Sequence, residues 1–209
     1  MDNERETKEK LLQSAKAEFL EKGYTAASLR TICKNAGVTT GALYFFFKDK
    51  EDLFASLVQA PLEKIMGIVT DHYASEAEHI FEYMQRSNSE NFEQSDDYIA
   101  SIQATKLLYS YYDEMILLLA KSQGSRFENC MDQFVSITEK HYAKMSEIIC
   151  KNKHKPNMDA HVIHWISHVQ IEAFGYLLTH VKSEEEAEKL LPHIIKYLTG
   201  GWYKLYDMI

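Results

Sequence analysis

Apolar residues recur three or four positions apart through nearly the whole chain, and this spacing is the strongest constraint on its fold. In the first segment, Leu11, Ala15 and Phe19 share one face of a helix. Almost no stretch alternates apolar and polar residues as a half-buried strand would. The 209 residues fit one domain, or one domain with a small appendage. We therefore expect an all-α protein of about nine helices, over residues 4–22, 28–36, 39–47, 49–73, 75–86, 96–121, 126–151, 158–181 and 183–207.

Composition excludes several other classes of protein. The three cysteines have no CxxC spacing, so they favour neither a disulfide framework nor a zinc ribbon. The first residues lack the apolar core of a signal peptide. The longest apolar run, residues 115–120, is far shorter than the roughly 20 residues that span a bilayer. We therefore expect a cytoplasmic protein with no membrane partner.

The net charge of −8 is distributed unevenly along the chain. Residues 1–56 carry equal numbers of basic and acidic side chains, so the whole excess of acidic groups lies in residues 57–209. An acidic surface repels polyanions. A nucleic acid would therefore bind at the N-terminal end.

Two short helices joined by the residues Ala36-Gly37-Val38-Thr39 fit a helix-turn-helix. Gly37 allows the backbone to turn between the helices, and Val38 fills the space between them. Ser28 can cap the first of these helices, and Thr39 can cap the second.

The second of these helices is expected to have one buried and one exposed face. Leu43 and Phe47 lie four positions apart and can both be buried, which leaves Tyr44 and Phe45 on the outside. Small residues at its start allow close approach to a phosphate or a base edge. Hydroxyl groups, and cations just beyond the helix, can donate to phosphate oxygens. The small residues are Thr40, Gly41 and Ala42, and the cations are Lys48 and Lys50.

Residues 23–53, with the sequence GYTAASLRTICKNAGVTTGALYFFFKDKEDL, resemble the DNA-binding domain of TetR-type (TetR/AcrR-like) transcriptional regulators. The similarity covers about residues 5–60, whereas the remaining residues share with the family only an acidic composition and a helical pattern. The resemblance implies a helix-turn-helix DNA-binding domain over residues 1–50. It also implies a larger helical effector-binding and dimerisation domain over residues 51–209.

The resemblance also implies a role for individual positions. Phosphate contacts are expected from Ser28, Thr39, Tyr44 and Lys50, and base-edge contacts from Thr40, Ala42 and Phe45. Phe46 stands where the family usually has Tyr or His, which removes one phosphate hydrogen bond. The helix also lacks the Arg, Asn and Gln that read guanine and adenine. Specificity is therefore expected from thymine methyl groups, DNA shape, and Arg30 or Lys34 of the preceding helix. A structural subdomain is the alternative, but the complete pattern favours DNA binding.

The last two expected helices, within residues 158–207, are apolar around much of their circumference. Such helices are covered on more than one side. A single helix-turn-helix also buries too little surface for tight specific binding, whereas a two-fold dimer contacts two half-sites. We expect a homodimer through a four-helix bundle, as the resemblance also implies, bound to a pseudo-palindromic double-stranded DNA operator.

A ligand cavity in the helical body would lie within about residues 62–180. Aromatic and methionine side chains at helical spacing usually form core. The alternative is a flexible apolar pocket for an unknown small hydrophobic effector. The candidate residues are Tyr109, Tyr112 and Met115 on one helix, and His141, Tyr142 and Met145 on the next.

Histidines leave a second interpretation open. His161, His164 and His168 form a stripe with Glu172 on one helix, and imidazole and carboxylate groups can bind zinc, nickel or copper. A polar stripe that lies in solvent or at an interface is the more ordinary interpretation. The pair Glu76 and His79 is a single Glu-x-x-His, whereas a di-iron bundle needs two. We therefore expect no metal and no cofactor.

Together these patterns predict a homodimeric, ligand-responsive transcriptional repressor and no enzyme. No nucleophile motif, cofactor loop or phosphate-binding glycine loop is present in the sequence. Effector binding is expected to move the helix that follows residue 49, so that the half-site spacing no longer fits DNA. Two alternatives remain open: a metal-binding or enzymatic bundle that uses the histidine stripe, and an architectural DNA-binding dimer without an effector.

Overall fold

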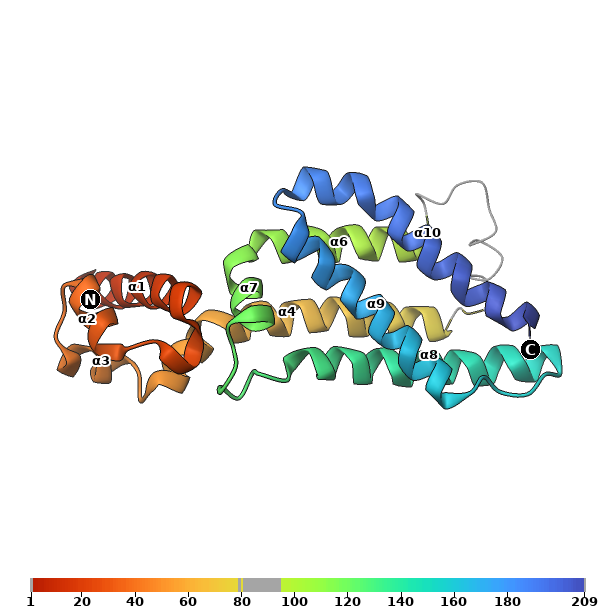
Figure 1. Cartoon of the computed structure of the whole chain (residues 1–209), viewed down its shortest axis with the longest axis horizontal. Helices are drawn as coiled ribbons and strands as arrows, with labels where there is room; N and C mark the ends of the chain where they lie inside the picture. The colour runs from red at the N-terminus through yellow and green to blue at the C-terminus, as the bar shows by residue number, and fades with distance from the viewer. Residues whose placement is uncertain (1, 79, 81–94, 209) are drawn as a thin grey trace. The chain divides into compact units, whose positions relative to one another are not determined.

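The computed structural model describes residues 2–78, 80 and 95–208, and this part of the chain is helical without strands (Figure 1). The prediction of an all-α fold with an N-terminal helix-turn-helix is confirmed. The described helices are α1 (Asp2–Ala26), α2 (Leu29–Ala36), α3 (Thr40–Phe46), α4 (Lys50–Glu78), α6 (Asp96–Ser110), α7 (Tyr112–Ala120), α8 (Cys130–Lys153), α9 (Ala160–His180) and α10 (Glu184–Met208).

Contacts divide the chain into two compact units, and neither is a continuous segment. Unit 1 combines residues 1–64 with 111–130, and unit 2 combines residues 65–110 with 131–209. α4 therefore contributes to both units. This division rests on packing alone, and the functional boundary expected between residues 50 and 51 stays a prediction.

Two of the expected helix boundaries were wrong. The helix expected over residues 96–121 is interrupted at Tyr111, whose backbone has φ −118 and ψ 35, and becomes α6 and α7. The break coincides with the change from unit 2 to unit 1 between residues 110 and 111. α4 continues to Glu78 with Pro61 inside it, beyond the end expected at residue 73. Most of the helix expected over residues 75–86 lies outside the described residues.

The core of unit 1 joins the first helices through large apolar side chains. Phe19 of α1 and Phe54 of α4 are fully buried, with ring centroids 5.0 Å apart in an edge-on arrangement. Leu43 and Phe47 are 0% and 2% exposed, so their predicted burial is confirmed. Each such side chain contributes about 1.5–3 kcal/mol through the apolar surface it withdraws from water.

Unit 2 contains two apolar clusters. In the first, Tyr142 of α8 stacks on Trp202 of α10 with ring centroids 4.3 Å apart. The second joins the end of α9 to α10 through Leu177 and Leu191, both of which are fully buried. Together the clusters connect α8, α9 and α10, and α10 also packs on α6.

One described helix, α4, is long and apolar enough to cross a membrane by length and composition. Core helices meet the same criterion. Leu53, Phe54 and Val58 of α4 are fully buried within unit 1, as the side chains of a core helix are.

Candidate nucleic-acid interface and interior cavity

Local hydrogen bonds fix the turn between α2 and α3. The Ser28 hydroxyl accepts from the backbone N–H of Thr31 at 3.3 Å and caps α2. Gly37 ends α2 in the left-handed conformation, with φ 69 and ψ 29, which favours glycine because it has no Cβ. The Thr39 hydroxyl accepts from the Ala42 N–H at 3.2 Å and caps α3. The turn predicted from the sequence is therefore present with its expected caps.

α3 has one face in the core of unit 1 and one face exposed. Tyr44 is 55% exposed and Phe45 is 71% exposed. Thr39, Thr40 and Gly41 are also exposed, and Ala42 is half-buried. Burial of Tyr44 and Thr40 would have excluded a DNA contact, but both side chains are accessible. The outer face of α3 is thus aromatic and hydroxylated, with small residues at its start.

The three predicted basic contacts differ in their surroundings. Arg30 and Lys48 are exposed. Lys50, by contrast, donates from Nζ to the carbonyl oxygens of Thr25 and Ala27, both at 3.1 Å, and lies 4.7 Å from the centroid of the Tyr24 ring. Burial lowers the pKa of the Lys50 ammonium. Lys50 therefore holds the turn between α1 and α2 in this structure, and its phosphate contact stays a prediction.

A distant segment completes unit 1. The Tyr24 N–H donates to the Lys121 carbonyl at 2.8 Å, and the Thr25 hydroxyl donates to the Gln123 carbonyl at 2.7 Å. Lys16 of α1 forms an ion pair with Glu114 of α7 at 3.0 Å. Sequence reasoning missed these contacts because the partners lie almost 100 positions apart and no local pattern links them.

Glu51 connects this distant segment to α4. Its carboxylate accepts from the Tyr24 hydroxyl at 2.8 Å and from the Arg126 N–H at 3.2 Å. Burial and the hydrogen bond to Glu51 raise the pKa of Tyr24 to about 12. The segment of residues 121–126 is therefore held to both α1 and the start of α4.

Unit 2 contains a partly open cavity of about 90 Å³ lined by residues of α4, α6, α8, α9 and α10. Its wall is largely aromatic, with Tyr142, Phe174 and Trp202 among the lining side chains. Trp202 is 4% exposed, and its Nε1 donor meets no acceptor among the described residues. Drug-sized ligand pockets have volumes of about 300–1,000 Å³. The cavity as it stands fits only a ligand of a few atoms.

The six predicted ligand-binding residues are divided between the two units. Tyr112 and Met115 belong to unit 1, whereas the other four belong to unit 2. The Tyr109 hydroxyl donates to the carbonyls of Leu177 and Val181, at 3.0 and 2.7 Å, and so ties α6 to the end of α9. Of the six, Tyr142 alone lines the cavity.

The remaining two predicted residues, His141 and Met145, lie in the core beside the cavity. Met145 is fully buried next to Tyr142 in the first apolar cluster. His141 is hydrogen-bonded to Glu76 and stacks on Tyr73. The interruption at Tyr111, which the sequence did not signal, is what separates the predicted set.

The histidine stripe of α9 lies at the surface. His161 and His164 are exposed, and His164 Nδ1 lies 3.2 Å from Glu139 Oε2. The rings of His164 and His168 meet edge-on at 4.7 Å. His79, which forms the Glu-x-x-His pair with Glu76, lies outside the described residues.

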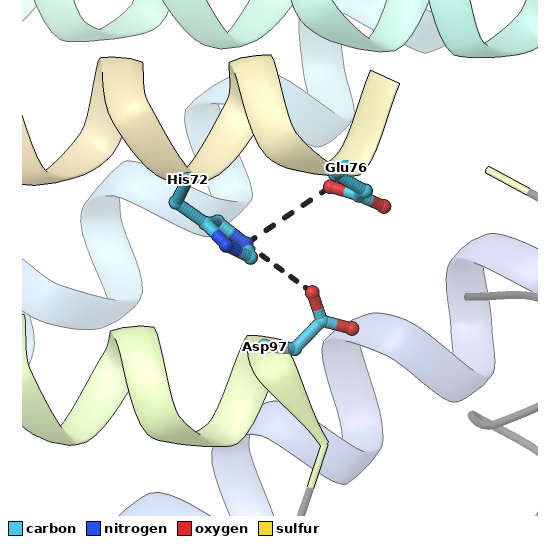
Figure 2. A group of neighbouring side chains, drawn as sticks. All are labelled: His72, Glu76 and Asp97. Carbon is cyan, nitrogen blue, oxygen red and sulfur yellow. Dashed lines mark ion pairs between the residues drawn. The ribbon is translucent and has the colours of Figure 1, made fainter. Parts of the chain in front are cut away.

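Another polar group lies in the wall of the cavity. His72 and Glu76 of α4 face Asp97 of α6, and His72 Nε2 is 3.2 Å from Asp97 Oδ1 (Figure 2). Burial by itself would lower the pKa of His72, but the hydrogen bond and charge of Asp97, helped by Glu76 and Asp96, raise it above its usual value. Within the described residues, this is the one group of three such side chains whose ligand atoms could meet a single ion.

Comparisons with known proteins agree with this description. The model of the family "Bacterial regulatory proteins, tetR family" matches residues 11–57. The HTH-type transcriptional repressor BepR of Brucella suis biovar 1 (strain 1330) is 45% identical over 64 residues, which is 29% of this chain and 31% of BepR. The HTH-type transcriptional regulator AcrR of Shigella flexneri is 46% identical over 52 residues, which is 25% of this chain and 24% of AcrR. The matched segments thus span about a third or less of these relatives.

Solved structures extend the similarity to the whole fold. NalD, the secondary repressor of the MexAB-OprM multidrug efflux pump in Pseudomonas aeruginosa, has a TM-score of 0.61 and 20% identity, over 96% of this chain and 98% of NalD. A transcriptional regulator from Aquifex aeolicus VF5 has a TM-score of 0.58 and 20% identity, over 92% of this chain and 99% of that one. At this identity the likeness concerns the fold alone. The N-terminal segment therefore matches the tetR family of bacterial regulatory proteins, and the fold of the whole chain is similar to that of the two solved regulators.

Proposed function

We propose that this protein is a homodimeric transcriptional repressor that binds double-stranded DNA through α3 and is released by a ligand bound in unit 2. The observation that carries the proposal is the outer face of α3, where Tyr44 and Phe45 are exposed beside a capped turn. A large aromatic side chain exposed without a covering partner marks a binding surface. The identity with segments of the HTH-type transcriptional regulators BepR and AcrR supports DNA as the partner of that surface.

Phosphate contacts would fix the position of α3 on DNA. The Tyr44 hydroxyl is exposed, and the exposed cations Arg30 and Lys48 come from the elements that flank α3. Phosphate contacts set register and affinity without reading sequence. Base contacts would come from Phe45 and the half-buried Ala42. Neither side chain offers a hydrogen bond, so thymine methyl groups and DNA shape are the expected determinants of specificity.

Dimerisation would use the exposed apolar side chains of α9 and α10. Trp165 and Tyr176 lie eleven positions apart on α9, a spacing that returns to nearly the same face, and are 61% and 53% exposed. Leu190 and Tyr197 lie seven positions apart on α10 and are 42% and 73% exposed. Two apolar stripes on neighbouring helices suit a four-helix bundle with a second copy. A dimer would supply the two half-site contacts that tight operator binding requires.

The cavity of unit 2 is the candidate ligand site. Tyr142, Phe174 and Trp202 give it an apolar wall, and the Nε1 donor of Trp202 could meet an acceptor on a ligand. A hydrophobic effector of ordinary size would have to push the lining helices apart, because about 90 Å³ is too small for it. α4 lines the cavity and also contributes to unit 1, so such a movement would reach the DNA-binding unit along this helix. Effector and operator would then weaken one another by the same factor.

The cavity also favours this proposal over an architectural dimer without an effector, which would need no internal space. Among the metal-binding alternatives, the stripe of His161, His164 and the half-buried His168 is disfavoured, because His161 and His164 are exposed to water and His164 already lies 3.2 Å from Glu139.

Selection of duplexes from a random pool tests the proposal. The full chain should enrich a pseudo-palindromic sequence, and Tyr44→Ala should weaken binding to the enriched and to random duplexes alike. Lys144→Ala is the matched control, because Lys144 is an exposed cation of α8 that the proposal does not use. Failure to enrich any sequence, or an equal effect of both variants, would contradict a DNA contact through α3.

A further inference from the structure

Three side chains that can ligate a metal meet between α4 and α6. His72 and Glu76 lie one helical turn apart on α4, and Asp97 lies in the first turn of α6 (Figure 2). His72 Nε2 is 3.2 Å from Asp97 Oδ1 and 4.0 Å from Glu76 Oε2. One ligand atom from each of the three residues lies within 4.8 Å of the other two.

The group is largely withdrawn from water. The side chains of His72, Glu76 and Asp97 are 16%, 9% and 14% exposed. Two carboxylates in such a place need compensating positive charge, because burial of an unpaired charge is costly. His72 lies beside both carboxylates, and His141 is hydrogen-bonded to Glu76. A divalent cation held by the three residues would balance the charge of both carboxylates.

We propose that His72, Glu76 and Asp97 bind one divalent first-row transition-metal ion. Metal–nitrogen bonds of about 2.0–2.1 Å and metal–oxygen bonds of about 2.0–2.2 Å place tetrahedral ligands roughly 3.4 Å apart. The observed separations of 3.2 and 4.0 Å bracket this value, so small side-chain movements complete the site. An imidazole with two carboxylates suits ions from Mn²⁺ to Zn²⁺, whereas Ca²⁺ and Mg²⁺ prefer oxygen ligands alone.

A second layer of contacts supports one ligand. His141 Nε2 lies 2.9 Å from Glu76 Oε2, and the His141 ring stacks on Tyr73 at 4.0 Å with an interplanar angle of 5°. The Tyr73 hydroxyl is held in turn by Thr138 and Gln170, both at 3.0 Å. Outer contacts of this kind orient ligating carboxylates. His141 is therefore a positioning residue for Glu76.

The group also has space for a metal-bound water and a route by which a cation can enter. Three protein ligands leave a coordination position for water, which takes about 30 Å³ and fits the cavity of about 90 Å³ beside the group. A second, more open hollow between α4 and α6 shares Ile68, His72 and Ala100 with the cavity. The carboxylates of Asp71 and Asp96 line this hollow and favour the approach of a cation.

The inference does not require that the protein bind DNA. Metal binding is measured on the protein without a duplex, so failure of the metal site and failure of the DNA-binding proposal are separate results. The sequence led us to expect no metal. This proposal replaces that expectation, because the group joins residues from two helices.

Titration of the chelator-treated full chain with Co²⁺, and then with Zn²⁺ in competition, tests the proposal. Co²⁺ should give visible ligand-field absorption that saturates at one ion per chain and is displaced by Zn²⁺. His72→Gln and Asp97→Asn should each weaken binding by about tenfold or more. If His72→Gln fails to fold, Asp97→Asn still tests the site, because Asp97 lies at the start of a helix. Circular dichroism measures whether each variant is folded.

Two further variants distinguish this site from the histidine stripe of α9. His141→Gln should weaken binding by about 10–100-fold with unchanged stoichiometry, since it removes only the support of Glu76. The double variant His164→Gln/His168→Gln should leave binding unchanged, because these residues belong to the surface stripe. Absence of saturable binding in the wild-type chain, or loss of binding in the double variant alone, would overturn the proposal.

Discussion

The two units place their aromatic and polar groups in opposite ways. In unit 1, α3 exposes Tyr44 and Phe45, while the polar groups beside them satisfy helix ends only three positions away in sequence. In unit 2, aromatic side chains surround a cavity, and the polar groups buried with them are joined across 25 to 97 positions. Exposed aromatics suit an external partner, whereas buried polar groups suit an internal ligand.

The outer face of α3 and the wall of the cavity are also held in position by different parts of the structure. The outer face of α3 keeps its position because its opposite face is anchored in the core. In unit 2, the cavity wall is itself the core, since Tyr142 and Trp202 both line the cavity and belong to the first apolar cluster. Substitutions can therefore separate binding from stability in unit 1 more cleanly than in unit 2.

The largest effect is expected from the anchored face of α3. Phe47→Ala should lower the free energy of unfolding by about 3–5 kcal/mol, because it leaves a cavity where a 2% exposed ring was packed. Phe45→Ala, two positions away on the exposed face, should change it by about 0.5 kcal/mol or less. Urea unfolding of both variants measures the contrast. Similar losses in the two variants would mean that α3 does not divide into an anchored and a free face.

A smaller effect, on assembly, is expected from the exposed stripe of α9. Trp165→Ala should weaken the dimer by roughly 2–4 kcal/mol, since an aromatic side chain at the centre of an interface carries much of its binding energy. Sedimentation equilibrium measures the dissociation constant. Ile99→Ala provides the control, because Ile99 is an exposed apolar residue of α6 outside the stripe. A dimer unaffected by Trp165→Ala would place the interface elsewhere.

The fold was largely predictable from the sequence where its determinants are local. Caps at Ser28 and Thr39, and the turn at Gly37, act within three or four residues, and all three were predicted and are present. Of the residues that line the cavity, Tyr142 was predicted, but the rest of the lining and the group around His72 were not. Their residues come from separate helices, so helical spacing within each segment carries no information on how they meet.

The same reasoning applies to the predicted ligand residues, whose role stays a prediction. Tyr109 and Tyr112 have a spacing that fits one helix face, but the chain is interrupted between them at Tyr111. No glycine or proline marks this interruption. It coincides with the change from one unit to the other, which no local pattern in the sequence indicates.

Removal of a single hydroxyl tests the exposed face of α3 more finely. Tyr44→Phe should weaken binding to specific and random duplexes alike by about tenfold per subunit, or about 1.4 kcal/mol, because a phosphate hydrogen bond is lost. Phe45→Ala should instead change the preferred sequence. Fluorescence anisotropy at several salt concentrations measures both, and wild-type binding should weaken steeply with salt. Altered base preference in Tyr44→Phe, with random-duplex affinity intact, would contradict a phosphate contact.

The smallest effect is expected at the cap of α3. Thr39→Ala removes the hydroxyl that accepts from the Ala42 N–H at 3.2 Å, and should lower the free energy of unfolding by about 1 kcal/mol. Thr39→Ser keeps the accepting oxygen and should cost little. The same hydroxyl is also expected to contact a DNA phosphate, because Thr39 is exposed. Thr39→Ala should therefore reduce DNA affinity by more than its loss of folding stability explains. Comparison of the two variants at a temperature where both are folded separates these roles: equal affinities would mean that Thr39 serves only to cap α3.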